Sequence, residues 1–89
     1  MKRIHLLISG DVQGVGFRSW IQIKAQDLHL TGWVKNRADG TVEVVAEGEE
    51  MNLLKLVQLC QQGPESGRVE QVKVQWLSGT GQFYSFEIF

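Results

Sequence analysis

The order of strand-like and helix-like hydrophobic patterns leaves few folds open to this chain. Apolar runs and apolar-polar alternation predict strands, whereas apolar residues spaced by three and four predict amphipathic helices. By these criteria the chain reads, in order, as a strand at 4–9, a helix at 17–28, strands at 32–36 and 41–46, a helix at 49–62, and strands at 72–76 and 84–88. The order β-α-β-β-α-β with a short terminal strand predicts an α+β, ferredoxin-like split βαβ sandwich, in which two helices cover one face of an antiparallel sheet.

The size of the chain limits it to one such unit. A chain of 89 residues buries about 60 to 65% of the surface that its unfolded form exposes, which supports one core but not two. We therefore expect a single domain over residues 1–89. The one cysteine, Cys60, cannot form an intramolecular disulfide, and it continues the apolar face of the second helix as a small buried hydrophobe. No apolar run suits a signal peptide or a membrane span, so we expect a cytoplasmic protein without a membrane partner.

Charge excludes one large class of partner. Nine Lys and Arg stand against ten Asp and Glu, a net charge of −1, which is too near neutral for binding along a nucleic acid. The charges are unevenly spread, however, because residues 1–37 contain six Lys and Arg against two Asp. This basic half favours binding of a small anion, or it is a surface dipole without function.

A glycine-rich segment, Gly10–Gly16, connects the first strand to the first helix. Glycines there let successive backbone N–H groups converge, and the helix N-terminus adds partial positive charge, so the segment suits a tetrahedral anion. Arg18 falls in the first helical turn, where a cation opposes the helix dipole unless its guanidinium closes over a bound anion. The alternative is an ordinary connection with Arg18 in water. No Lys-Ser or Lys-Thr follows the last glycine, which argues against a nucleotide cofactor.

Asn36 is the second candidate, at the end of a predicted strand and just before the Asp39-Gly40 turn. Its carboxamide both donates and accepts hydrogen bonds, so it suits the holding of an attacking water beside a phosphoryl group. Asn is also common at hairpin ends, so a purely structural turn role fits the same residue. His5 and His29 have no partners at metal-ligand spacing, so no metal site is predicted.

Two motifs in this chain resemble those of the acylphosphatase family. They are Gly10-Asp11-Val12-Gln13-Gly14-Val15-Gly16-Phe17-Arg18 and Gly32-Trp33-Val34-Lys35-Asn36, with looser similarity at Asp39-Gly40-Thr41-Val42, Gly63-Pro64, Arg68-Val69 and 84–88. The resemblance implies hydrolysis of the carboxylic-phosphoric anhydride of an acyl phosphate, on a ferredoxin-like fold, without metal or cofactor. It also implies that Asn36 orients the water, and that the phosphate is bound by Arg18 and by the backbone amides of Gln13, Gly14, Val15, Gly16 and Phe17.

The chemistry of phosphoryl transfer agrees with this resemblance, because it depends on positioning and charge stabilisation more than on covalent catalysis. The resemblance implies an acylphosphatase that binds acyl phosphates and phosphate, and we expect it to be a monomer. A carbamoyl phosphate preference is an alternative within the enzyme class. Outside that class, the alternative is a non-enzymatic ferredoxin-like module that binds a small anionic metabolite or a protein partner. Binding of single-stranded RNA would need exposed aromatics that the first strand lacks.

Overall fold

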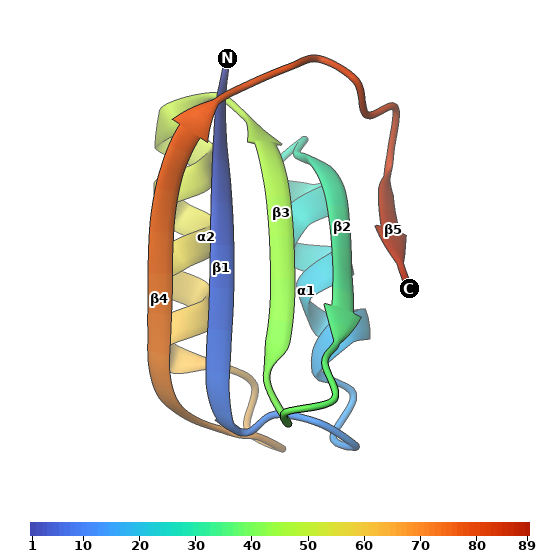
Figure 1. The fold of residues 1–89 in the computed structure, drawn as a ribbon, viewed down its shortest axis with the longest axis vertical. Coiled ribbons are helices and arrows are strands. Elements are labelled where there is room, and N and C mark those ends of the chain that lie inside the picture. The colour runs from blue at the N-terminus through green and yellow to red at the C-terminus, as the bar shows by residue number, and fades with distance from the viewer.

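The computed structural model describes residues 1–89 and contains five strands and two helices. In chain order they are β1 (Lys2–Asp11), α1 (Phe17–Asp27), β2 (Thr31–Asn36), β3 (Val42–Gly48), α2 (Glu50–Gln62), β4 (Arg68–Ser78) and β5 (Phe86–Ile88). The strands form one sheet in the order β4-β1-β3-β2-β5. Both helices cover the same face of this sheet (Figure 1). The predicted ferredoxin-like sandwich is therefore confirmed, and neither helix has the length and apolar character to cross a membrane.

The direction of the last strand corrects one part of the fold prediction. The four longer strands pair antiparallel, as expected, but β5 pairs parallel with β2. The chain leaves β4 at one edge of the sheet and crosses over its end to the opposite edge, so β5 returns in the direction of β2 (Figure 1). β5 is also shorter than predicted, and Tyr84 lies outside it with its side chain 98% exposed.

The outer strand β4 and its neighbour β1 are longer than the sequence predicts. Gly10, expected to open the loop, lies within β1 at a β-bulge, where the register between β1 and β4 shifts. A Cβ at this position would lie 2.2 Å from the Arg68 carbonyl oxygen, so only glycine permits the close backbone approach. Val74 and Trp76, expected to be half-buried, are 37% and 41% exposed. They pair with the buried Leu6 and Ile4 of β1 and so face the helix layer, but at the edge of the sheet they are only partly covered.

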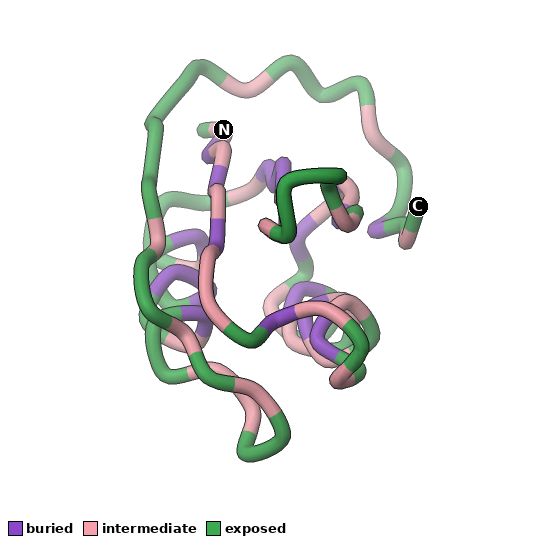
Figure 2. Tube along the Cα trace, turned by 60° about the horizontal axis from the view of Figure 1, so that its bottom comes forward, coloured by how far each residue is buried: buried purple, intermediate pink, exposed green.

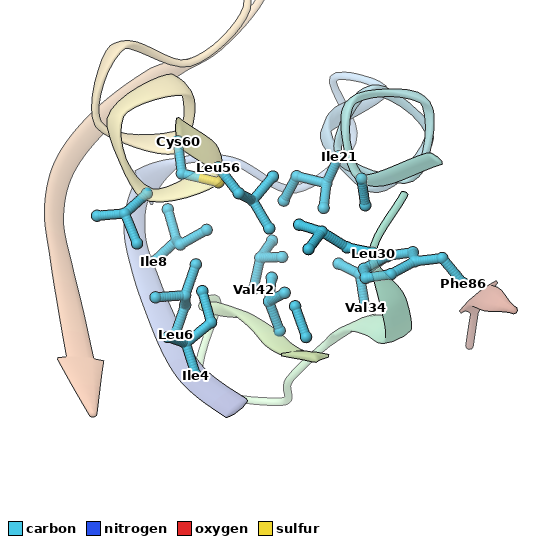
Figure 3. Packing of buried hydrophobic residues seen from close by; sticks show 14 of the residues in the cluster. Ile4, Leu6, Ile8, Ile21, Leu30, Val34, Val42, Leu56, Cys60 and Phe86 are labelled. Carbon is cyan, nitrogen blue, oxygen red and sulfur yellow. The ribbon is translucent and has the colours of Figure 1, made fainter. Parts of the chain in front are cut away.

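The hydrophobic core fills the space between the sheet and the two helices (Figure 3). Alternation along β1 places Ile4, Leu6 and Ile8 on the helix-facing side, in one buried cluster with Ile21 of α1 and Cys60 of α2. The buried stretches of the chain line this interior, whereas the connection from β4 to β5 is largely exposed (Figure 2). Cys60 is fully buried, and desolvation raises the pKa of its thiol to about 12. The prediction that Cys60 is a small buried hydrophobic residue is confirmed.

Glu47 of β3 fastens the β4–β5 connection to the sheet, on the face without helices. Its carboxylate accepts hydrogen bonds from Arg3 Nε (2.7 Å), Thr80 N (3.0 Å), Thr80 Oγ1 (2.9 Å) and Gly81 N (2.9 Å). The residue is only 1% exposed. This burial by itself would raise the pKa of Glu47, but the hydrogen bonds from Thr80, Gly81 and Arg3 lower it to about 2. The buried carboxylate therefore stays ionised and holds the crossing segment in place.

Replacing Glu47 by glutamine should lower the free energy of unfolding by about 3 kcal/mol, because a buried acceptor of four hydrogen bonds loses its charge. Because the folded pKa lies below the ordinary value of 4.5, this stabilisation is complete above pH 4.5. It fades as the pH falls from there toward 2. Urea unfolding followed by far-UV circular dichroism at several pH values measures both effects.

The control for this experiment is Glu50→Gln, which removes an exposed ion pair to Lys2 at 3.4 Å. Exposed pairs contribute less than about 1 kcal/mol, so this variant should unfold almost like the wild type. A Glu47→Gln variant with the wild-type urea midpoint would show that the carboxylate does not stabilise the fold.

Candidate active site

The β1–α1 loop and the β2–β3 turn lie at the same end of the molecule (Figure 1). Between them is a pocket of about 100 Å³. It is lined by Val12, Gly14, Gly16, Phe17, Arg18, Ser19, Asn36 and Ile88. A water molecule occupies roughly 30 Å³ of liquid, so the pocket has room for a group of a few heavy atoms. Pockets for drug-sized ligands are roughly 300 to 1,000 Å³, so this one is too small for a nucleotide.

The loop that enters α1 is shaped by two glycines in the left-handed region, Gly14 with φ 74° and Gly16 with φ 76°. A Cβ would meet nothing within 4 Å at either position, so the backbone conformation, not space, is what favours glycine. Gly16 is also the N-cap of α1, whose first turn has neither a capping side chain nor an acidic residue. The first N–H groups of the helix, with their partial positive charge, are therefore available to an anion in the pocket.

Arg18 is the second residue of α1, and its half-buried side chain lines the pocket. One guanidinium N–H donates to the main-chain oxygen of Phe89 at 2.9 Å. Phe89 is held in turn by its own N–H, which donates to the Val34 carbonyl oxygen at 2.9 Å. A guanidinium has five N–H donors, so most remain free for an anion. The alternative in which Arg18 simply lies in water is not supported.

Asn36 ends β2 on the same side of the sheet as the buried Val34, so it faces the helix layer and the pocket. Its Oδ1 is buried and accepts no hydrogen bond. The turn that follows is closed without this side chain, by an Arg37 N–H bond to the Thr41 carbonyl oxygen (2.9 Å) and by Gly40 with φ 90°. The Asn36 side chain takes no part in closing this turn, and no donor in the fold pairs with its buried acceptor.

Two of the predicted loop residues do not line the pocket. The Gln13 side chain reaches the β2–β3 turn, and the Val15 carbonyl oxygen accepts a hydrogen bond from Ser66 Oγ at 2.9 Å. The roles of their amides in phosphate binding stay predictions. His5 lies on the opposite face of the sheet, with its Nε2 2.6 Å from Glu43 Oε2, and it cannot reach the pocket as a base.

Sequence reasoning missed what the C-terminal strand contributes to the site. Ile88 lines the pocket and Phe89 accepts the hydrogen bond from Arg18. Both positions depend on the parallel pairing of β5 with β2, which joins segments more than fifty residues apart in the chain. No local pattern at 84–89 signals this pairing.

Comparison with known proteins shows the family to which this chain belongs. A family model described as Acylphosphatase matches residues 4–88. The chain belongs to the acylphosphatase family. It is 49% identical over 86 residues to the acylphosphatase of Pelotomaculum thermopropionicum and, over the same length, to that of Marinobacter nauticus, in each case covering 97% of this chain and 94% of the relative. The crystal structure of acylphosphatase from Bacillus subtilis matches with a TM-score of 0.96 at 37% identity, covering 100% of this chain and 99% of that one.

Membership of the acylphosphatase family confirms the resemblance noted in the two sequence motifs. It also confirms that the chain is an enzyme, a hydrolase of this family, and not a non-enzymatic module on the same fold. Both motifs lie at the pocket, since Gly14, Gly16 and Arg18 come from the first and Asn36 from the second.

Proposed function

We propose that this acylphosphatase hydrolyses the mixed anhydride bond of acyl phosphates in the pocket between the β1–α1 loop and Asn36, releasing a carboxylate and inorganic phosphate. The observation that carries the proposal is the shared pocket. Arg18 and Asn36 are far apart in the sequence, yet both line one small cavity at the uncapped start of α1.

The phosphoryl group is bound by Arg18 and by backbone amides of residues 13–17. In the transition state, negative charge spreads over the three non-bridging phosphoryl oxygens, and fixed N–H donors stabilise it without reorganising. Arg18 supplies the formal positive charge, and its planar fork matches two oxygens at once. The main-chain oxygen of Phe89 holds the guanidinium in place before substrate binds, so less side-chain entropy is lost on binding.

The water is oriented by the carboxamide of Asn36. A carboxamide has both an acceptor and a donor, so Asn36 can hydrogen-bond to the water and hold its oxygen toward phosphorus. The water oxygen forms a bond to phosphorus as the bond from phosphorus to the acyl oxygen breaks, and the electron pair leaves with the carboxylate. The proton of the water passes to a phosphate oxygen of the substrate. No lining residue has a carboxylate, imidazole or thiol to accept it.

The leaving group explains why this site needs no metal. A carboxylate is a weak base and departs without Lewis-acid assistance, so positioning and charge stabilisation suffice. The purified enzyme should therefore release phosphate from benzoyl phosphate at the same rate with and without EDTA. It should act at least about 100-fold more slowly on glycerol phosphate, whose alkoxide is a poor leaving group, a difference of about 2.7 kcal/mol in activation free energy.

A coupled assay of inorganic phosphate measures these rates directly. Loss of activity in EDTA that returns with a divalent cation would contradict the metal-independent mechanism. Saturable binding of phosphate without turnover of any acyl phosphate would contradict the proposed function itself.

A further inference from the structure

We propose that the side-chain carboxamide of Gln13 is a positioning group that fixes the phosphate-binding loop against the strand end that carries Asn36. The proposal rests on the proposed function, in which the loop binds the phosphoryl group and Asn36 orients the water. Gln13 Nε2 donates to the Arg37 carbonyl oxygen at 2.8 Å and to the Thr41 carbonyl oxygen at 2.9 Å. Both hydrogens of the carboxamide nitrogen are thereby used.

The two acceptors lie on either side of the β2–β3 turn, at its base. Arg37 directly follows Asn36, and Thr41 directly precedes Val42, the partner of Asn36 in the β2–β3 ladder. A single carboxamide therefore bridges both strands of the hairpin at the level of Asn36. At its other end, the Gln13 backbone leads into Gly14, the first left-handed residue of the loop.

No other hydrogen bond links residues 12–16 to residues 37–41. The loop has a second anchor on its far side, where Ser66 Oγ donates to the Val15 carbonyl oxygen at 2.9 Å. Phe17, at the end of the loop, is buried in the core. These contacts fix the loop to α1 and to the α2–β4 connection, but they do not set its distance from the hairpin.

The distance between the phosphate-binding loop and Asn36 matters because attack on phosphorus requires the water, the phosphorus and the leaving oxygen to lie roughly in line. Displacement of a reacting group by about 1 Å can cost about 100-fold in rate. Without the Gln13 link, the loop and Arg18 still bind phosphate and Asn36 still binds water, but their relative position is no longer fixed. The loss should therefore fall on kcat more than on phosphate binding.

The test is Gln13→Met, which keeps the length of the side chain and removes both donors. We expect kcat for benzoyl phosphate to fall about 30-fold, while the inhibition constant of inorganic phosphate changes less than about threefold. The matched control is Gln75→Met, the same substitution at an exposed position of β4 without a side-chain hydrogen bond. This control should keep wild-type kinetics.

A double-mutant cycle separates positioning from a general loss of structure. If Gln13 acts by fixing Asn36 relative to the loop, then Gln13→Met introduced into an Asn36→Ala enzyme should lower kcat by less than about threefold. Additive losses in the double variant would overturn the proposal, as would wild-type kcat in Gln13→Met.

Gln13→Glu provides a second variant with a pH readout. At neutral pH its carboxylate faces two carbonyl oxygens without a hydrogen to donate, so kcat should fall at least as far as in Gln13→Met. Protonation at lower pH restores one O–H donor, so kcat relative to the wild type should rise as the pH is lowered. A constant ratio across the pH range, with both proteins folded by circular dichroism, would count against the inference. A wild-type enzyme inactive on every acyl phosphate would instead overturn the proposed function.

Discussion

Arg18→Ala is expected to lower kcat/KM for benzoyl phosphate by about 1,000-fold, the largest effect of any single side chain in this protein. Arg18 is the one cationic side chain that lines the pocket, and it lies at the start of α1 beside the amides of Gly16 and Phe17. Its removal takes away both the formal charge and the donors that match the phosphoryl oxygens. Substrate binding and turnover should therefore weaken together, with a parallel rise in the inhibition constant of inorganic phosphate.

Two further variants define what Arg18 contributes. Arg18→Lys keeps the charge without the planar fork, and it should recover only part of the lost activity. Lys24→Ala removes a cation from the same helix, next to Trp20 and outside the pocket, and its kcat/KM should stay within about twofold of the wild type. An Arg18→Ala enzyme within tenfold of wild-type kcat/KM would exclude a central role in phosphate binding.

Asn36→Ala is expected to lower kcat by about 100-fold or more while KM and the phosphate inhibition constant stay within a few fold of the wild type. The attacking water matters in the transition state and not in substrate binding, so the loss belongs to turnover. The stability of this variant offers an independent measurement. Because Asn36 Oδ1 is buried without a hydrogen-bond donor, its removal should leave the free energy of unfolding unchanged or raise it.

The matched control is Asn52→Ala, which removes a carboxamide from α2 outside the pocket and should leave kcat unchanged. Steady-state kinetics with benzoyl phosphate and urea unfolding of the same samples provide both readouts. A rise in KM equal to the fall in kcat/KM would mean that Asn36 contributes to substrate binding instead of turnover. A wild-type kcat in Asn36→Ala would mean that Asn36 has no part in the mechanism.

Local patterns were enough to predict most of the fold and to indicate Arg18 and Asn36 as candidate site residues. Alternation in β1 and helical spacing in α1 and α2 reflect burial on one face, which each segment expresses by itself. The glycines at 14 and 16 mark backbone that other residues rarely adopt, and Arg18 stands out because a cation is unfavourable at a helix start. Asn36 was harder to interpret, since its sequence position fits a turn equally well.

The tertiary structure decided the features that depend on residues distant in the chain. The parallel pairing of β5 with β2 brings Ile88 to the pocket and Phe89 to Arg18. Glu47 accepts hydrogen bonds from Thr80 and Gly81, which lie 33 and 34 residues further along the chain. Such contacts leave no periodic trace, because each partner alone looks like an ordinary exposed polar or terminal residue. Sequence by itself determined the order of the elements and indicated the candidate site residues, whereas the crossing of the chain to the far edge of the sheet determined which C-terminal residues lie beside them.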